Sequence, residues 1–111
     1  KKLKVIDAIC SELEIKNITT QHIRAEQIKN RKFDFAVSRA VAPLKELWSW
    51  TKPLLKKENK MSDYKNGLIC LKGGDLAQEI SDAGLKPFAK PIDQIFKEEF
   101  FKDKFILYVP Q

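Results

Sequence analysis

The chain has 111 residues, of which 43% are hydrophobic and 32% are charged, which is typical of one small folded domain and argues against a disordered chain. Its 21 basic and 15 acidic residues give a net charge of +6, which permits binding to a polyanion without proving it. No apolar run approaches the roughly 20 residues of a membrane-spanning helix, and the start lacks a signal-peptide pattern, so we expect a cytoplasmic protein with no membrane partner.

The first half of the chain predicts two helices and two strands. Apolar residues at spacings of three and four predict a helix over residues 2–14. The β-branched run "NITTQHI" (17–23) predicts a strand followed by a loop or a single helical turn, and "FDFAVS" (33–38) predicts a second strand. A helical stripe then covers residues 44–55, where Pro53 should kink or shorten the helix.

The second half predicts three strands and one helix. The continuously apolar run "GLICL" (67–71) predicts a strand covered on both faces, and "LAQEISDAG" (76–84) predicts a short helix that ends at its glycine. The segments "KPFAKPIDQIF" (86–96) and "KFILYVP" (104–110) predict two strands close enough in sequence to pair antiparallel. The alternation of strands and helices favours an α/β fold with a mostly parallel sheet.

The chain carries few residues suited to metal binding or nucleophilic catalysis. Its two cysteines, Cys10 and Cys70, lie in apolar patterns, so we expect buried and reduced thiols. His22 is the only histidine, and no Cys/His group has the spacing of metal ligands. The sequence therefore predicts neither a zinc site nor a Ser-His-Asp triad.

Polar residues follow three of the predicted strands. Because ligands of open α/β sheets bind at the carboxyl ends of the strands, this position selects "RAEQ" (24–27), Ser38–Arg39 and "KGGD" (72–75). Each segment also has a purely structural interpretation. The first could hold a surface ion pair, the arginine of the second could close a loop on a carboxylate, and the third could be only a strand-to-helix turn. The full P-loop and G-x-G-x-x-G patterns are both absent from the sequence.

Taken together, the three segments carry a family resemblance. The order "RAEQ…KFDFAVSRAVAPLKEL…GLICLKGGD" resembles the bacterial 16S ribosomal RNA guanine-N7 methyltransferases, formerly called glucose-inhibited division protein B. The opening "KKLKVIDAICSELEIKNI" is similar to the helix that follows strand two in that family. The resemblance runs over nearly the whole chain and is strongest in residues 24–44 and 67–75. It is weak from residue 85 onward, where the tail departs from the expected arginine-containing sequence.

The resemblance implies a Rossmann-like, S-adenosylmethionine-dependent methyltransferase fold of seven strands. Residues 1–111 would form one partial domain with about strands three to seven and a C-terminal antiparallel strand pair. The glycine-rich cofactor loop and the acidic ribose contact would lie upstream. Strands one and two lie between strands three and four in that fold, so without them strand three would lack a neighbour and apolar surface would be exposed. We expect the isolated chain to be inactive, to bind no cofactor, and to associate or rearrange through exposed strand edges.

The resemblance also implies roles for individual residues. Ala25 and Glu26 would contact the adenine side of S-adenosyl-L-methionine. Arg39 would lie where cofactor and guanine meet, and it could bind guanine O6, the cofactor carboxylate or a phosphate. Lys72, with Gly73, would contact the substrate, 16S rRNA or the small ribosomal subunit. No general base is expected, because guanine N7 already has an available lone pair.

Two other functions are compatible with the sequence. The chain could be a basic RNA-binding or interaction module without catalysis, or part of another α/β enzyme such as a small-molecule methyltransferase. A strand and a glycine-rich loop upstream would indicate an enzyme, and RNA dependence of methylation would separate the two enzymes.

Overall fold

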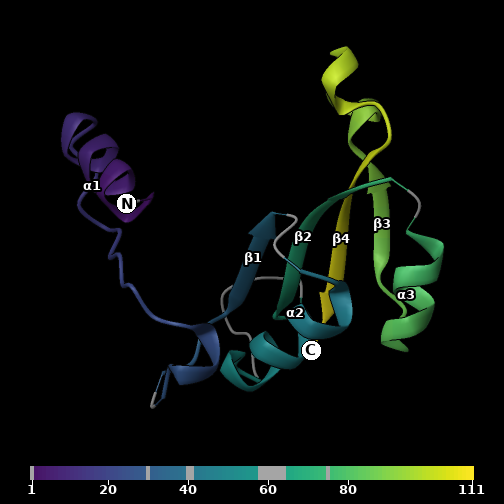
Figure 1. Cartoon of the computed structure of the whole chain (residues 1–111), viewed down its shortest axis with the longest axis horizontal. Helices are drawn as coiled ribbons and strands as arrows, with labels where there is room; N and C mark the ends of the chain where they lie inside the picture. Colours follow the sequence, from purple (N-terminus) through teal and green to yellow (C-terminus); the bar gives the residue numbers. More distant parts are fainter. Residues whose placement is uncertain (1, 30, 40–41, 58–64, 75) are drawn as a thin grey trace.

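The part of the chain that the structure describes folds around a four-stranded sheet, shown in the computed structural model of Figure 1. The described residues are 2–29, 31–39, 42–57, 65–74 and 76–111, so Asp75 of the predicted turn lies outside them. The sheet has the strand order β1-β2-β4-β3. The strand bounds are Phe35–Arg39 for β1, Gly67–Gly73 for β2, Phe88–Pro91 for β3 and Lys104–Pro110 for β4.

Helices alternate with the strands, which confirms the mixed α/β class. Within the described residues the α-helices are α1 (Lys2–Glu12), α2 (Leu44–Thr51) and α3 (Ala77–Ala83). Short 3-10 turns are η1 (Ala25–Gln27), η2 (Lys52–Leu54), η3 (Ile92–Gln94) and η4 (Glu99–Phe101). None of the helices in the described part of the chain is both long and apolar enough to cross a membrane.

Two predicted helix ends are confirmed. The helix α2 stops at Thr51 and continues as the 3-10 turn η2, where Pro53 lacks the N–H that a further α-helical turn needs. The helix α3 ends at Gly84, which takes the left-handed conformation with φ of 67°. That conformation is unfavourable for a residue with a Cβ atom, so glycine is suited to this position.

The strands β1, β2 and β3 run in the same direction and β4 runs in the opposite one. Because β4 lies between β2 and β3, two of the three hydrogen-bonded pairs are antiparallel. The pair β1–β2 is parallel, as predicted, and β3–β4 is antiparallel, as predicted. The strand β4 also pairs antiparallel with β2, because it lies between β2 and β3. The prediction of a mostly parallel sheet is therefore wrong for the hydrogen-bonded pairs. The short connection between β3 and β4 reverses the chain, whereas a parallel neighbour would need a long crossover.

The helices α2 and α3 cover one face of the sheet (Figure 1). Leu68 and Cys70 of β2 and Leu107 of β4 are fully buried there, against Leu44 and Leu47 of α2. Because successive strand residues point to opposite faces, this alternation assigns every second residue of β2 to the helix layer. Removing such apolar side chains from water supplies the main stabilisation of the sheet, at about 25 cal/mol per Å².

No α-helix of the described residues packs on the opposite face of the sheet, although the 3-10 turns η3 and η4 lie near the end of that face beside Leu71. An apolar hollow on that face is lined by Phe35, Ile69, Ile106 and Tyr108, and Val37 of β1 is 72% exposed. The prediction that β2 is covered on both faces is therefore wrong for the described structure, whereas the predicted exposure of apolar surface is confirmed. Association of the chain through this surface stays a prediction.

The predicted strand over residues 17–23 is also wrong. The structure has no strand there, and the segment leads from α1 to η1 without a β partner among the described residues. A strand forms only where a neighbour accepts its backbone hydrogen bonds, whatever its β-branched content. The helix α1 stands apart from the sheet in Figure 1, with exposed apolar side chains and a half-buried Cys10.

Candidate functional site

The carboxyl ends of β1 and β2 lie side by side. In this parallel pair Phe35 lies opposite Gly67 and Arg39 lies opposite Leu71. The last residue of β1 is therefore adjacent to the end of β2, where Lys72 and Gly73 follow. Two of the three predicted strand-end segments thus meet at one edge of the sheet.

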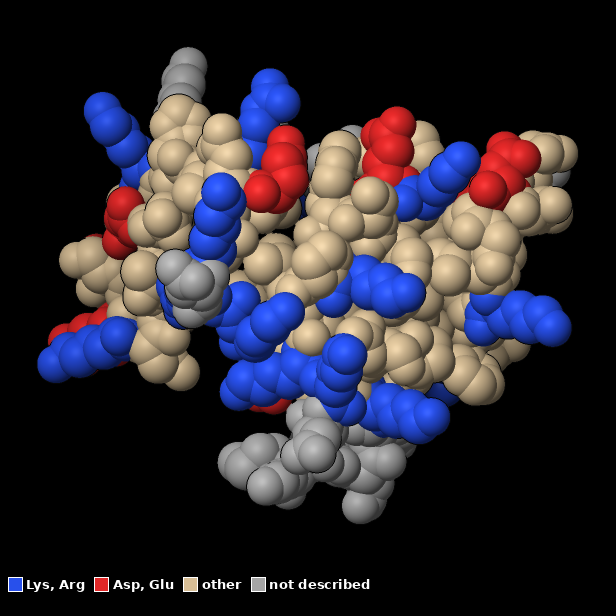
Figure 2. Space-filling model, turned by 90° about the horizontal axis from the view of Figure 1, so that it is seen from below, with Lys and Arg blue, Asp and Glu red and all other residues tan. Residues whose placement is uncertain are grey.

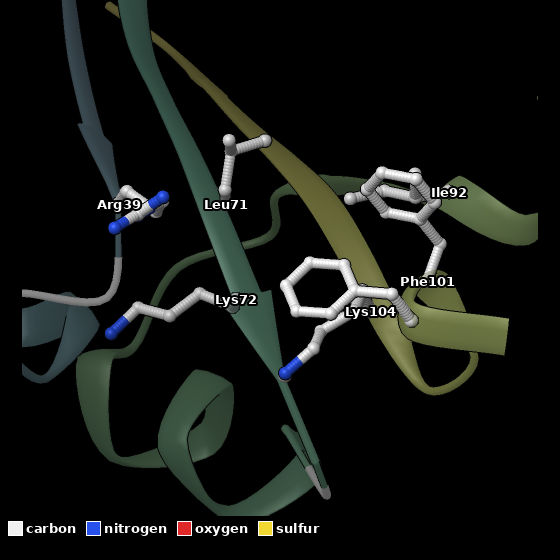
Figure 3. A pocket seen from close by; sticks show the side chains of 8 residues that line it. Arg39, Leu71, Lys72, Ile92, Phe101 and Lys104 are labelled. Carbon is white, nitrogen blue, oxygen red and sulfur yellow. The ribbon is translucent and has the colours of Figure 1, made fainter. Parts of the chain in front are cut away.

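The side chains at this edge point to opposite faces. Arg39 and Leu71 share the face that lacks α-helices, whereas Lys72, one residue further along, points toward the layer of α2 and α3. Figure 3 shows the Lys72 side chain directed away from Phe101 and toward the helices. The guanidinium of Arg39 and the ammonium of Lys72 therefore point away from each other, although the ends of β1 and β2 are neighbours.

Lys72 takes part in a buried polar network. Its side chain is 8% exposed, and its Nζ lies 2.8 Å from Oε1 of Glu79 in α3 and also donates to the Ala42 carbonyl. The same Glu79 oxygen accepts the backbone N–H of Leu44 at 2.8 Å. The ion pair therefore fastens β2, α3 and the start of α2 together. Through the Ala42 carbonyl and the Leu44 N–H, it also holds the segment at the start of α2. Contact between Lys72 and substrate RNA stays a prediction.

A hollow of about 330 Å³ opens beside Arg39 (Figure 3). Its described lining is Arg39, Leu71, Lys72, Gly73, Ile92, Phe100, Phe101 and Lys104. No acidic side chain is among these residues. The Arg39 side chain is exposed and has no hydrogen bond or ion pair with another described residue, and its contact with a ligand stays a prediction.

Lys104 is a site residue that the sequence did not predict. It lies opposite Gly73 in the β2–β4 pair, and its side chain crosses over that glycine. A Cβ atom at Gly73 would lie 3.1 Å from both Cδ and Nζ of Lys104. The glycine therefore gives the lysine its path to the hollow. The antiparallel pairing of β2 with β4, which brings these residues together, has no local signal in either strand.

A second hollow, of about 380 Å³, lies at the open edge of β1. It brings Ala25 and Glu26 of η1 together with Ser38 of β1 and Trp50 of α2. The Ser38 hydroxyl is buried and has no hydrogen-bond partner among the described residues. An unpaired buried hydroxyl and a nearby carboxylate fit a ligand with amino and hydroxyl groups.

The structural interpretation of "RAEQ" (24–27) as a surface ion pair is confirmed for Arg24 and Glu26. Arg24 and Glu26 approach to 3.7 Å, and both side chains are well exposed. An exposed pair at this distance contributes at most about 1 kcal/mol to stability. It therefore leaves the Glu26 carboxylate accessible to a ligand.

Basic side chains also gather at the other end of the sheet. Figure 2 shows several Lys and Arg side chains side by side on the face seen from below. A hollow of about 540 Å³ is lined there by Lys32, Lys52, Lys56 and Lys57. Part of this charge is balanced, because Lys56 lies 3.7 Å from Asp34.

The two cysteines are free and differ in environment. Cys70 is buried as predicted, and burial raises the pKa of its thiol to about 11, with Lys72 lowering and Glu79 raising it by smaller amounts. Cys10 is only half-buried, so the prediction of a buried thiol is wrong for it. No group of His, Cys, Asp and Glu suited to a metal ion occurs in the described part of the chain.

The sequence model of the family described as rRNA small subunit methyltransferase G matches residues 1–94. The chain belongs to this family. A Ribosomal RNA small subunit methyltransferase G from Porphyromonas gingivalis is 44% identical over 110 residues, covering 99% of this chain and 49% of the relative. That of Flavobacterium psychrophilum is 44% identical over 112 residues, covering 99% of this chain and 51% of the relative. No solved structure matches the chain significantly.

Membership of the rRNA small subunit methyltransferase G family confirms the resemblance carried by the three strand-end segments. The chain spans about half the length of the curated relatives it matches, including 52% of the relative from Cytophaga hutchinsonii. The family model ends at residue 94, whereas the alignments with the relatives from Porphyromonas gingivalis and Flavobacterium psychrophilum cover 99% of the chain and so include the segment that contains Phe100 and Lys104.

Proposed function

We propose that this chain is the C-terminal part of an S-adenosyl-L-methionine-dependent methyltransferase that methylates N7 of a guanine in 16S rRNA. The observation that carries the proposal is the position of two consecutive residues at the end of β1. Ser38 borders the hollow of Ala25 and Glu26, and Arg39 borders the hollow of Gly73. The two hollows therefore adjoin the same end of β1, on the two faces to which Ser38 and Arg39 point. A cofactor that reaches around this end would bring its methyl group to the base.

The proposal assigns the described strands to part of a Rossmann-like methyltransferase domain. Residues 1–111 would form one partial domain, with β1 as strand four and β2 as strand five of the family's fold. The preceding strands would cover the open edge of β1 and the exposed Val37. This assignment explains why residues 17–23 have strand-like composition without a partner.

The second hollow fits the adenosine end of S-adenosyl-L-methionine. The Ala25 backbone would face the adenine ring, and the Glu26 carboxylate would accept a hydrogen bond from the adenine amino group. The Ser38 hydroxyl, which has no partner among the described residues, would form a hydrogen bond with the cofactor. Arg39 would neutralise the cofactor carboxylate or hold the guanine. When bound, the cofactor supplies an electrophilic methyl group.

The residues of the chain would act mainly by positioning. Guanine N7 has an available lone pair, so no side chain needs to remove a proton before attack. The rate would come from holding N7 in line with the methyl group at close range. Arg39 would donate to guanine O6, which holds the base by its edge and leaves the N7 lone pair free to attack the methyl group.

A second candidate function is a basic RNA-binding or interaction module without catalysis. The lysines around the hollow at the other end of the sheet favour it, because clustered Lys side chains attract phosphate. The isolated chain would fit this description, and we expect it neither to bind the cofactor nor to transfer methyl groups.

The test is methyl transfer by the full-length protein. With labelled S-adenosyl-L-methionine, we expect transfer to 16S rRNA or to the small ribosomal subunit, and cleavage chemistry specific for 7-methylguanine should locate the label. Transfer to free nucleotides alone would favour a small-molecule methyltransferase. RNA binding without any transfer would favour the module.

A further inference from the structure

The aromatic residues that precede β4 form a cluster beside the hollow of Arg39. The rings of Phe100 and Phe101 meet edge to face with centroids 5.2 Å apart, and the Phe96 ring lies 5.4 Å from that of Phe101. Phe101 is half-buried, but Phe100 is 74% exposed. Phe101 therefore supports one edge of Phe100 while most of the Phe100 ring faces solvent.

Lys104 adds positive charge to this aromatic cluster. Its Nζ lies 5.7 Å from the centroid of the Phe100 ring, within the range of a cation–π contact. Residues 97–104 contain three basic and three acidic residues. None of the acidic ones lines the hollow among the described residues. The side of the cluster that faces Arg39 is therefore cationic.

We propose that Phe100 and Lys104 form a stacking platform for single-stranded RNA. Phe100 stacks on a base that neighbours the target guanine, and Lys104 contacts the phosphate beside that base. The inference rests on the proposed function, since it places the platform at the rim of the hollow that contains Arg39. It assigns a role to two residues that lie beyond the family model, which matches residues 1–94.

The geometry favours a single-stranded RNA over a duplex. An aromatic ring can stack only on a base whose face is free, and bases of an RNA helix are stacked on one another. A hollow of about 330 Å³ is at the small end of ligand pockets, which suits one splayed base. Stacking on an aromatic ring tolerates any base, because each has a π face, so Phe100 adds affinity and leaves the choice of base to other groups.

A protein partner is the main alternative for an exposed aromatic cluster. The cationic lining argues for a polyanion, because Arg39 and Lys104 would both be left without a counter-charge against an apolar protein surface. RNA supplies both the flat apolar faces and the negative charge that this surface lacks.

The experiment measures RNA binding by the full-length protein. The probe is a fluorescein-labelled single-stranded RNA of about ten nucleotides, within the size range of single-strand binding sites. Fluorescence anisotropy gives Kd for wild type, Phe100→Ala, Phe100→Tyr and Phe88→Ala. Phe88 is a matched control, because it is 67% exposed, stacks on Tyr108 and does not line the hollow.

We expect Phe100→Ala to raise Kd between about 5-fold and 100-fold, whereas Phe100→Tyr and Phe88→Ala stay within about 2-fold of wild type. Because Phe100 carries no charge, its loss should leave the salt dependence of Kd unchanged. Lys104→Met should lower the slope of log Kd against log salt concentration by about 0.7, the value for one phosphate contact to a single strand.

Equal Kd values for Phe100→Ala and Phe88→Ala would overturn the platform, even if the wild type methylates 16S rRNA. A wild type that does not bind the RNA would overturn it too, and a change of oligomeric state in Phe100→Ala without a change of Kd would show a protein contact instead. If wild type binds through Phe100 but transfers no methyl group, the platform stands and the proposed reaction fails.

Discussion

The ammonium group of Lys72 lies 2.8 Å from a carboxylate oxygen of Glu79, within the layer between sheet and helices. The pair connects the end of β2 to α3, and the shared oxygen also holds the first N–H of α2. The start of α2 is therefore held by a charge pair and not by apolar packing alone.

Breaking this pair should destabilise the protein strongly. Lys72→Met in the full-length protein leaves Glu79 partly buried without its counter-charge, and we expect a loss of about 3 kcal/mol in the free energy of unfolding. Urea denaturation measures the change. The double variant Lys72→Met/Glu79→Leu should recover most of the loss, because two apolar groups need no partner. A single variant as stable as wild type would show that solvent already screens the pair.

Gly67 should be far less tolerant of substitution than Gly73. A Cβ atom at Gly67 would lie 2.3 Å from the Val109 carbonyl oxygen, which belongs to the backbone of β4 and cannot move freely. We expect Gly67→Ala to separate β2 from β4 and to cost more than about 3 kcal/mol. Gly73→Ala is the matched control, because its close contacts are with the flexible Lys104 side chain and the Asp103 carbonyl oxygen lies at 3.6 Å, an ordinary van der Waals distance. Thermal unfolding of the two variants compares them, and equal stabilities would contradict the close β2–β4 contact.

The Cys70 thiol should make stability fall at alkaline pH. Burial raises its pKa in the folded protein from 9.0 to about 11. Below pH 9 the thiol is protonated in both states and its full contribution is present. As the pH rises from 9 toward 11, the unfolded chain loses the proton first, so unfolding becomes more favourable. Cys70→Ala should lower stability at every pH but flatten this dependence in urea titrations. An unchanged pH dependence would argue against a raised pKa.

Ser38 should affect cofactor binding more than stability. Its buried hydroxyl has no partner among the described residues, so Ser38→Ala in the full-length protein should leave the free energy of unfolding unchanged or slightly higher. If this hydroxyl bonds to S-adenosyl-L-methionine, its loss should raise KM for the cofactor about 5-fold, equivalent to one hydrogen bond. Steady-state kinetics with saturating RNA measure KM. A normal KM together with lower stability would indicate a purely structural hydroxyl.

Apolar spacing and helix-breaking residues in the sequence predicted the elements that depend on their own residues. The stripe of residues 44–55 with its Pro53 gave α2 and a 3-10 turn, and the apolar run of residues 67–71 gave a buried central strand. The segment 17–23 has the composition of a strand but no neighbour, and composition carries no information about a distant partner. Whether such a segment forms a strand therefore depends on a pairing partner that the composition of the segment does not reveal.

The candidate site was predictable to the same extent. The rule that ligands bind at the carboxyl ends of strands placed Arg39 near Gly73, because these are the last residues of the parallel strands β1 and β2. It did not place Lys104 or Phe100 there, since their position depends on the register between β2 and β4. It also could not show that Lys72 points to the opposite face from Arg39, where Glu79 binds it.

Methylation of 16S rRNA by the full-length protein with and without the Arg39 side chain tests the central claim most directly. We predict that wild type transfers methyl groups from S-adenosyl-L-methionine to guanine N7. We predict that Arg39→Ala abolishes transfer while the urea midpoint stays the same, because Arg39 is exposed and has no partner among the described residues. Near-normal methylation by Arg39→Ala would remove Arg39 from the site and contradict the account.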